Sequence, residues 1–517
     1  MKTLLDSTTS IWMHTKAIPT QAALCENVEA DVCVVGAGIA GMTTAYLLLL
    51  EGKSVVVLED GLVGGGETQR TTAHLSNAID DRYVNIERWH GESGARLAAE
   101  SHTAAIDRVE AIIKREGIDC EFTRLDGYLF NAPGESRKGL EQELEAARRA
   151  GLSLVEFASR CPWDHFDSGA CLKFPRQGQF HPLKYLAGLQ QAILRMGGRI
   201  YTQTHVEKIE SGSSIRTQTT PGFNVTSSSV VVATNTPFND LVTIHTKQAA
   251  YISYVMGFAM PPASIAKGLY WDTLNPYHYV RIHSLPASDS CDGPQPLDIL
   301  IVGGEDHKTG QADDAEDRYQ RLESWTRERF PSAGNIVYQW SGQVMETIDG
   351  LAFIGRNPLD SSNVFIATGD SGQGMTHGTI AGILLTDLIV GRDNPWSTLY
   401  DPARKTLRAA GRYVKENLNV ALQYSSWVTG GDESSLQAIM PGSGAVVRDG
   451  LTKVAAYRDA QGELHQCSAV CPHLGCIVEW NHNESTWDCP CHGSRFDKQG
   501  HLVCGPANRD LERIQTD

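Results

Sequence analysis

The chain has 517 residues and a formal net charge of −16, with 41% hydrophobic and 21% charged residues. This length predicts about two to four domains of ordinary globular composition, and the negative charge argues against nucleic acid as a partner. No apolar run approaches the length of a membrane span and the N-terminus shows no export signal, so we expect a cytoplasmic protein without a membrane span.

The cysteines are distributed unevenly along the chain. Of the 12 cysteines, six are scattered before residue 425 and six fall after residue 466. In an intracellular protein, such clustering indicates a metal site rather than a disulfide framework. The clustered residues are Cys467, Cys471, Cys476, Cys489, Cys491 and Cys504.

A dinucleotide-binding pattern stands near the N-terminus. The apolar strand at 31–35 leads into Gly36, Gly38 and Gly41, which permit a sharp turn, close approach of the backbone to a pyrophosphate, and tight helix–strand packing. A helix at 42–51 and a strand at 54–58 follow, and Glu59 can then accept hydrogen bonds from an adenosine ribose. The alternative is a coincidental turn. The expected contacts in this turn are Gly36, Ala37, Gly38, Ile39, Ala40 and Gly41.

The next elements follow from hydrophobic periodicity and turn residues. A glycine-rich loop over 61–74 lets the backbone approach a ligand closely. We expect a long helix or helix pair at 85–116, helices at 139–150 and 181–196, and strands at 199–204 and 230–234.

Residues 245–340 change character and predict a separate antiparallel sheet. Its strands are expected at 251–260, 277–282 and 297–302, with a helix at 318–330. A buried strand at 364–368 then enters a glycine-rich turn and a helix that ends at Val390. A helix at 404–421, a linker at 425–444 and an all-β module follow. The dinucleotide-binding part is thus interrupted by the second sheet.

Three motifs together resemble the D-amino-acid oxidase superfamily of FAD enzymes. They are the early glycine triplet, Asp349-Gly-Leu-Ala-Phe-Ile-Gly355 and Ala367-Thr-Gly-Asp-Ser-Gly-Gln-Gly-Met-Thr-His-Gly378. The resemblance covers about residues 25–424 and implies FAD rather than NAD. It implies an α/β (α+β) fold in which a Rossmann-like FAD-binding domain is interleaved with an antiparallel substrate domain. The implied FAD-binding segments are about 25–90, 165–240 and 340–424, and the substrate-domain segments about 91–164 and 241–339.

The late motif makes physical sense as a flavin contact. A strand, a glycine-rich turn and a helix start point backbone N–H groups and a positive helix end at a ligand, although a tight turn without a ligand is the alternative. The implied FAD contacts here are Gly369, Gly372, Gly374 and Met375, and elsewhere Val206, Thr71, Thr72, His74, Ala233 and Thr234. His74 loosely resembles a covalent attachment position, but Ala73 departs from that motif, so we expect noncovalent FAD.

Candidate substrate residues lie in Tyr277-His-Tyr-Val-Arg281. Strand alternation puts Tyr277, Tyr279 and Arg281 on one face, where a guanidinium can hold a carboxylate. The alternative is a solvated strand face. His377 is a further candidate, although a single loop histidine is more often structural. The predicted catalytic residues are Tyr279, Arg281 and His377.

The C-terminal part carries Cys471-Pro-His473 and Cys489-Pro-Cys-His492. Two thiolates suit one iron and two imidazoles the other, which is the mixed ligation of a Rieske [2Fe–2S] centre. A zinc site with the same four ligands is the alternative. We therefore predict a cluster domain over 445–517, after the linker.

The loops Cys471-Pro-His-Leu-Gly-Cys476 and Cys489-Pro-Cys-His-Gly-Ser494 closely resemble the Rieske proteins of cytochrome complexes. The resemblance implies a disulfide between Cys476 and Cys491, and a cluster-covering proline loop at 505–507. Phe496 replaces the family's hydrogen-bonding tyrosine, while Ser494 is retained. We expect a potential within roughly −150 to +300 mV but below the top of that range.

The combined pattern predicts an FAD-dependent dehydrogenase for a small amine or amino acid. Electrons would pass from the reduced flavin through the Rieske [2Fe–2S] cluster to an external acceptor. In one alternative the Rieske domain feeds electrons into a flavin monooxygenase-like site. In the other, the protein is a redox sensor or carrier without a substrate.

Overall fold

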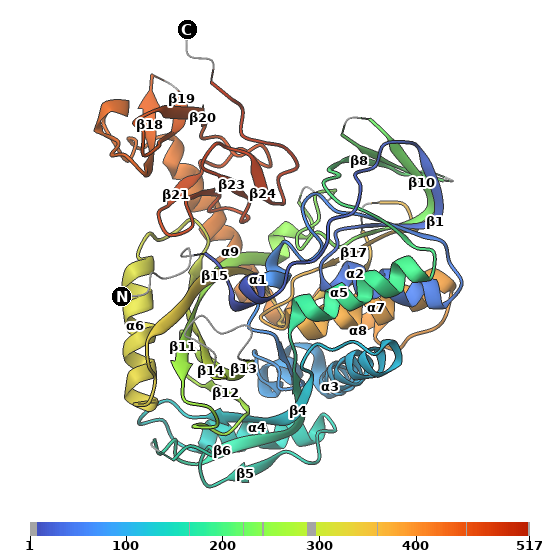
Figure 1. The fold of residues 1–517 in the computed structure, drawn as a ribbon, viewed down its shortest axis with the longest axis vertical. Helices are drawn as coiled ribbons and strands as arrows, with labels where there is room; N and C mark the ends of the chain where they lie inside the picture. Colours follow the sequence, from blue (N-terminus) through green and yellow to red (C-terminus); the bar gives the residue numbers. More distant parts are fainter. Residues whose placement is uncertain are drawn as a thin grey trace.

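The computed structural model describes residues 8–164, 166–212, 214–220, 222–239, 242–286, 296–358, 360–450 and 452–514. It contains two large sheets and a small C-terminal β module, drawn in red in Figure 1. None of the helices in this described part combines the length and apolar character that a membrane crossing needs.

The first sheet contains the strand that precedes the glycine triplet. Its central pairs are parallel, whereas β16 pairs antiparallel with β17. β8 and β9 continue the sheet beside β10. In order the path is β16 (Phe353–Arg356), β17 (Val364–Thr368), β10 (Asn224–Val232), β1 (Val28–Val35), β2 (Val55–Leu58) and β7 (Arg199–Tyr201), with β8 (Val206–Glu210) and β9 (Ile215–Thr219) at the side.

Helices α2 (Ile39–Leu50), α5 (Pro182–Arg195) and α7 (Gly374–Val390) pack beside this sheet, as Figure 1 shows. Gly378 of α7 faces Ile39 of α2, where an added Cβ would lie 2.6 Å from the isoleucine side chain. Glycine therefore allows the two helices to approach closely near their first turns. Both helices begin after parallel strands, so both N-termini face the same carboxyl edge of the sheet.

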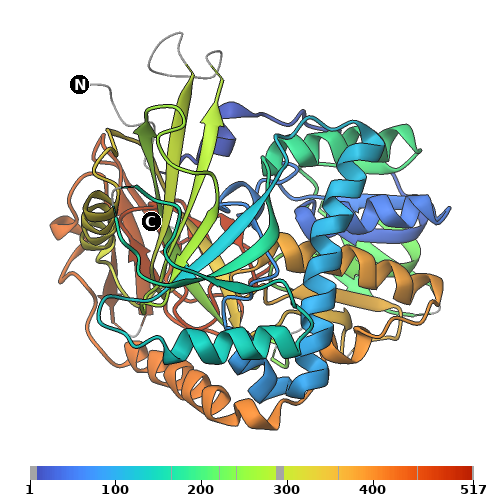
Figure 2. The same cartoon turned by 90° about the horizontal axis from the view of Figure 1, so that it is seen from below.

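The second sheet is mainly antiparallel, but β12 and β4 pair in parallel. Figure 2 shows α3 between this sheet and the helices of the first sheet. The long helix predicted at 85–116 is interrupted by non-helical Gly91. The strands are β15 (Ile336–Thr347), β11 (Gln248–Met260), β14 (Leu297–Lys308), β13 (His278–Leu285), β12 (Leu269–Asp272), β4 (Thr123–Phe130), β6 (Cys171–Gln179) and β3 (His74–Leu75), with β5 (Glu156–Ala158) beside β6. The helices are α1 (Ile11–Thr15), α3 (Tyr83–Glu116), α4 (Lys138–Arg149) and α6 (Ala315–Arg329).

The boundary between the two sheets differs from the sequence expectation. β6 falls in the segment 165–240 that was expected to bind FAD, and β15 extends eight residues into the segment that starts near 340. β6 contains Pro175 and Gly178 and shows no regular alternation, so its pairing with β4 could not be inferred locally. The second sheet therefore contains residues from segments that were expected to belong to the FAD-binding domain.

The C-terminal module follows α8 (Ser397–Tyr400) and α9 (Ala410–Gln423). The linker expected at 425–444 is only partly a linker, because Asp432 accepts a hydrogen bond from the backbone N–H of Val446 at 2.9 Å and Ile439 is buried. The module has one sheet of β18 (Ser443–Asp449), β19 (Thr452–Arg458) and β20 (Leu464–Ser468), and another of β21 (Glu479–Asn481), β22 (Thr486–Asp488), β23 (Arg495–Asp497) and β24 (Leu502–Cys504).

Candidate active site

A cavity of about 600 Å³ lies at the carboxyl edge of the first sheet. The second sheet and the C-terminal module supply its other walls. The structure brings all predicted FAD contacts to its lining except Ala37 and Gly41. Gly41 lies behind the turn, where an added Cβ would be 1.9 Å from the carbonyl oxygen of Gly36. These two residues shape the turn rather than line the cavity.

The dinucleotide end of the cavity is built on Gly36 and Glu59. Gly36 has a φ of +101°, and an added Cβ would lie 2.4 Å from the carbonyl oxygen of Ala233, so glycine is required there. Glu59 accepts hydrogen bonds from the backbone N–H groups of Ala37 at 2.7 Å and Gly61 at 2.9 Å. Burial raises the pKa of Glu59, while those two N–H groups oppose the shift. A glycine cradle with a fixed acid fits an adenosine dinucleotide.

The flavin end is built from the late glycine turn and the loop at 70–74. Gly369 and Gly372 have φ values of +74° and +73°, and α7 starts immediately after them. The His74 ring lies 5.7 Å from the Tyr279 ring, with its Nδ1 3.1 Å from Thr72 Oγ1. Burial lowers the pKa of His74 to about 3, so the imidazole is neutral. The backbone N–H groups at the α7 start fit the electron-rich edge of a flavin.

Arg281 lies outside the cavity lining, in contrast to the expectation that it contacts substrate. It is 1% exposed, and its Nη1 donates to the carbonyl oxygens of Thr72 at 3.0 Å, Ala73 at 2.9 Å and Phe180 at 3.3 Å. Tyr277 precedes β13 and lines the cavity with Tyr279, whereas the guanidinium of Arg281 reaches carbonyl groups of the loop that carries His74. Arg281 thus holds this loop in place.

Tyr279 and His377 both line the cavity. The Tyr279 hydroxyl lies 2.7 Å from Ser253 Oγ. His377 Nδ1 lies 2.8 Å from the carbonyl oxygen of Asp370, and burial holds the pKa of His377 well below its usual value. Hydrogen-bonded in this way, His377 fixes the glycine turn that precedes α7.

Carboxyl groups gather at the flavin end of the cavity. Asp80 accepts hydrogen bonds from the Tyr277 hydroxyl at 2.9 Å and from Gln373 Nε2 at 2.8 Å. Burial raises the pKa of Asp80 and that of Asp306 to about 6 each, and holds the pKa of Glu346 well above its usual value. Among the described residues, none of these three acids forms an ion pair at 4 Å or less, so Asp80 and Asp306 carry negative charge without a paired cation once they ionise, while burial favours the neutral form of Glu346. Sequence reasoning missed all three, because single acids in loops and strands carry no local signal.

The two cysteine–histidine loops of the C-terminal module converge. Cys471 and Cys489 are each 1% exposed, and the His473 and His492 rings lie 5.0 Å apart. Burial and the neighbouring His473 lower the pKa of His492 to about 4, which keeps its imidazole neutral and able to bind metal. Two buried thiols and two imidazoles fit a [2Fe–2S] cluster.

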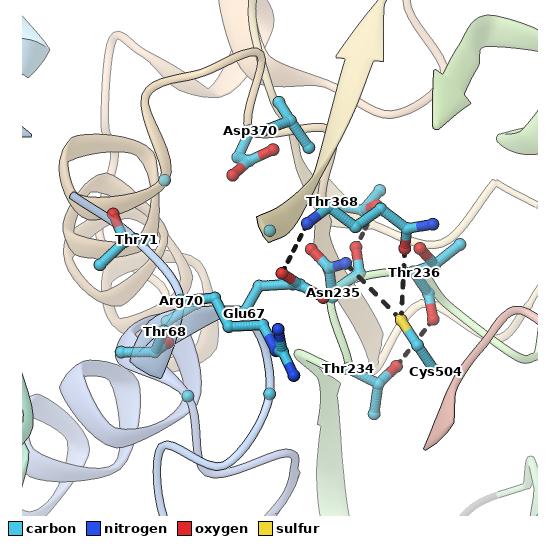
Figure 3. Close-up of a pocket in the computed structure, with 18 of the residues that line it drawn as sticks. Glu67, Thr68, Arg70, Thr71, Thr234, Asn235, Thr236, Thr368, Asp370 and Cys504 are labelled. Carbon is cyan, nitrogen blue, oxygen red and sulfur yellow. Dashed lines mark hydrogen bonds between the residues drawn. The ribbon is translucent and has the colours of Figure 1, made fainter. Parts of the chain in front are cut away.

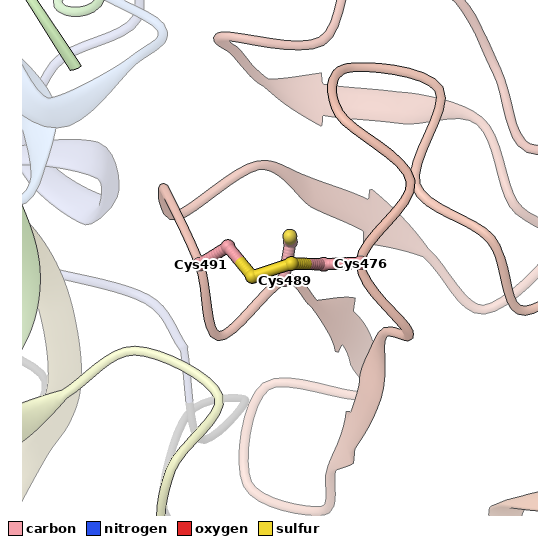
Figure 4. Close-up of side chains that lie close together, drawn as sticks. All are labelled: Cys476, Cys489 and Cys491. Atoms are coloured by element: carbon pink, nitrogen blue, oxygen red, sulfur yellow. A yellow bond between two sulfur atoms is a disulfide. The ribbon is translucent and has the colours of Figure 1, made fainter. Parts of the chain in front are cut away.

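A disulfide joins the two loops between Cys476 and Cys491, beside Cys489 (Figure 4). The Cα atoms of the bridged residues are 6.4 Å apart. The Ser494 hydroxyl accepts a hydrogen bond from the backbone N–H of Ala507 at 2.9 Å, which ties the proline loop to the second cluster loop. Phe496 is fully buried and offers no donor to a ligand sulfur.

The histidine edge of the cluster site faces the rest of the protein. His245 is 2% exposed, and its ring lies 4.8 Å from that of His473 and 5.8 Å from that of His492. Nearby, Gln343 of β15 donates to the carbonyl oxygen of Gly493 at 2.9 Å. No sequence signal marked His245 or Gln343, because both act across an interface between segments far apart in the chain.

Together, the fold and the two sites define an oxidoreductase that combines a dinucleotide cofactor with an iron–sulfur cluster. Residues 31–388 match the family model described as FAD dependent oxidoreductase (DAO), and residues 426–515 match the Rieske [2Fe-2S] domain. The chain belongs to the FAD-dependent oxidoreductase family and carries a C-terminal Rieske domain. Its cofactors are FAD and a [2Fe–2S] cluster, as the motifs predicted, and the zinc alternative is wrong.

Relatives share this architecture in whole or in part. Protein YhfW of Bacillus subtilis, whose name describes a Rieske 2Fe-2S iron-sulfur protein, is 32% identical over 98% of this chain and 97% of its own length. Gamma-glutamylputrescine oxidoreductase of Escherichia coli is 28% identical over 71% of this chain and 85% of its own length. The crystal structure of glycine oxidase from Geobacillus kaustophilus superposes with a TM-score of 0.58 at 18% identity, covering 73% of this chain and 100% of that one. This last likeness concerns the fold alone.

Proposed function

We propose that the protein is a dehydrogenase for a small cationic amine that delivers electrons through its Rieske cluster to an external acceptor. When bound, FAD accepts two electrons from the substrate and the [2Fe–2S] cluster carries one at a time. The observation that carries the proposal is the docking of the Rieske domain, whose two histidine ligands lie against His245. Three residues farther along the chain, Gln248 Oε1 accepts a hydrogen bond at 3.2 Å from Thr368, which lines the flavin cavity.

The acids at the flavin end support an amine substrate. Asp80, Asp306 and Glu346 line the cavity with the aromatic side chains of Trp271 and Tyr279. A substrate ammonium would compensate the negative charge and could also lie over an aromatic face. The E. coli relative is named for a polyamine derivative, which agrees with this choice.

Among the described residues, the lining has no lysine or arginine at this end that could pair with a substrate carboxylate. The lining cations are Arg70 and Arg495, and both lie at the Rieske side of the cavity, where Arg70 pairs with Glu484 at 3.1 Å and Arg495 with Asp488 at 3.1 Å. Arg281 is occupied by three carbonyl oxygens. We therefore favour an amine without an adjacent carboxylate over an amino acid.

The external acceptor has an exposed approach to the first cluster loop. Leu474 is exposed beside Tyr424, whose hydroxyl donates to the Leu474 carbonyl oxygen at 2.8 Å. On α9, Val414, Leu418 and Leu422 are exposed at four-residue spacing and lead toward this loop. We propose that an electron-carrier protein contacts this apolar surface.

The cytoplasm is the proposed location, since the described cysteines of the FAD-binding part are free thiols.

An anaerobic titration followed by visible absorbance tests the substrate class. 1,4-Diaminobutane and ornithine form a matched pair, because ornithine is the same diamine with an added carboxylate. We expect the diamine to bleach the flavin at a concentration at least about tenfold lower than ornithine, given roughly 1.4 kcal/mol for an unpaired buried charge. Preferred bleaching by ornithine would contradict the amine assignment. Reduction only by a reduced carrier would favour the monooxygenase-like alternative, and no reduction by any substrate would favour the sensor.

A further inference from the structure

One wall of the FAD cavity belongs to the Rieske domain. The segment 502–508 lines the same cavity as Glu59, Val206 and Thr234, which are predicted FAD contacts of the first sheet. In an FAD-binding fold that works alone, this side would be open to solvent or covered by the fold's own loops. Here β24 and the proline loop occupy it.

Asn508 makes hydrogen bonds across this wall. Its side-chain amide donates to the backbone carbonyl oxygens of Val206 at 3.2 Å and Glu207 at 2.8 Å. The backbone carbonyl oxygen of Asn508 lies 3.3 Å from His205 Nε2. β8 begins at Val206, which is the expected adenine contact. The Rieske domain is thus fastened directly to the adenine side of the cavity.

Cys504 forms a second contact farther along the wall. Its thiol lies 3.4 Å from Gln343 Oε1 and 4.0 Å from Asn235 Nδ2. Figure 3 shows the Cys504 sulfur directed at the turn that carries Thr234, Asn235 and Thr236. This turn follows β10 and lines the middle of the cavity.

A buried charge cluster completes the wall. Arg495 of the Rieske domain is 3% exposed, and its positive charge, with that of Arg70, opposes the rise that burial causes in the pKa of Glu67. Glu67 belongs to the glycine-rich loop and accepts a hydrogen bond from the backbone N–H of Gln343 at 2.7 Å. These contacts join the FAD-binding loop, the second sheet and the Rieske domain at one place.

We propose that residues 502–508 of the Rieske domain are part of the FAD-binding site and close it over the adenosine dinucleotide. FAD then enters and leaves only when this segment separates from residues 205–207 and 234–236. The same segment is tied to the second cluster loop through Ala507 and Ser494. Retention of a noncovalent FAD and docking of the cluster domain are therefore linked through one short stretch of chain. The proposal depends on FAD binding and not on which substrate the enzyme oxidises.

The rate of FAD release from the full-length holoprotein tests this. Asn508→Ala removes two hydrogen bonds across the wall, so we expect FAD release, measured as the recovery of free flavin fluorescence on dilution, to accelerate about tenfold or more. Asn27→Ala is the matched control, because Asn27 also hydrogen-bonds backbone, accepting from the N–H of Asn224 at 2.9 Å, but does not line the cavity. The control should release FAD at the wild-type rate. Iron content and the EPR spectrum of the reduced cluster show whether each variant keeps an intact Rieske domain.

Hydrogen exchange of the wild-type protein provides a second measurement that needs no variant. Adding FAD to FAD-depleted protein should slow exchange in peptides that cover 502–508, and leave β18 and β19 of the same domain unchanged. Wild-type release from Asn508→Ala protein with full cluster content would overturn the proposal. Equal exchange at 502–508 with and without FAD would also overturn it, and this result decides the matter if the variant loses its cluster.

Discussion

The four predicted cluster ligands lie between residues 471 and 492, whereas the lining of the flavin cavity runs from Thr8 to Asn508. The cluster site is made by two loops of one small module, which a disulfide holds together. The cavity needs two sheets and the Rieske domain at once. A site made by adjacent loops survives changes elsewhere in the fold, but a composite site depends on how its parts dock.

Removal of a cluster ligand should give the largest difference between the function of the flavin cavity and that of the cluster site. In His473→Ala protein, we expect substrate to reduce the flavin while turnover with the external acceptor falls to background, because the exit route is lost. Stopped-flow absorbance and steady-state assays measure the two steps. His465→Ala is the control, since His465 lies on β20 away from the ligands. Wild-type turnover by the His473 variant would contradict the exit role of the cluster.

Loss of the disulfide should weaken the cluster module and leave the cavity lining unchanged. The Cys476–Cys491 bridge closes a loop of 15 residues, for which the chain-entropy model gives about 3 kcal/mol. Cys476→Ser with Cys491→Ser should lower the denaturant midpoint for loss of cluster absorbance. Without denaturant, where the module stays folded and docked, a FAD-binding titration should stay near wild type. Two free thiols at these positions in native protein, detected by mass spectrometry after alkylation, would remove the basis for this expectation.

Substrate affinity tests the acid end of the cavity. Asp80→Asn or Asp306→Asn should raise KM for a cationic amine roughly thirtyfold, because loss of one partner of a buried charge pair costs about 2 kcal/mol or more. Asp393→Asn, on an exposed loop, is the matched control. An unchanged KM in both cavity variants would argue that the ammonium binds elsewhere.

The same acids predict a pH dependence. Each carboxyl is ionised above its pKa, and burial raises the pKa of Asp80 and Asp306 to about 6. Binding of an ammonium is therefore lost as the pH falls through about 6, and KM should rise between pH 7 and pH 5. In protein carrying both Asn substitutions this rise should be much smaller. Parallel profiles for the two proteins would assign the titration to another group.

Substitution of Arg281 should change the free energy of unfolding more than it changes KM for the substrate. Arg281→Lys should lose at least one of three hydrogen bonds to buried carbonyl oxygens, which costs roughly 1–2 kcal/mol of unfolding free energy. Thermal unfolding followed by flavin fluorescence measures this loss. A raised KM with unchanged unfolding would return Arg281 to the substrate site.

The smallest effect is expected at the apolar surface near the cluster. Leu474→Asp adds a charge to an exposed contact, so the apparent affinity for a protein acceptor should fall a few fold, while a small dye accepts electrons at the wild-type rate. Leu154→Asp, at an exposed leucine of the substrate-sheet part, should have no effect on either assay. Equal acceptor kinetics for the two variants would move the docking surface elsewhere.

Local sequence was sufficient to predict those features whose residues lie close together in the chain. The strand and turn at Gly36 were predictable because the turn sterically requires glycine, and the cluster loops because the ligand types and their spacing are specific. Strands such as β6 were missed because their partners, not their own alternation, determine them. Strand alternation alone could not place the guanidinium of Arg281, because the direction of its long side chain is set by three surrounding carbonyl groups.

The sequence by itself determined the two cofactors, the family of each part and the order of the main elements. Only the tertiary structure decided that Asp80, Asp306 and Glu346 meet at one end of the cavity, and that Asn508 closes the other. The physical reason is that hydrogen bonds and buried charges between distant segments leave no periodic trace in either segment. Their effect exists only once burial removes water and brings these groups within hydrogen-bonding or electrostatic range of one another.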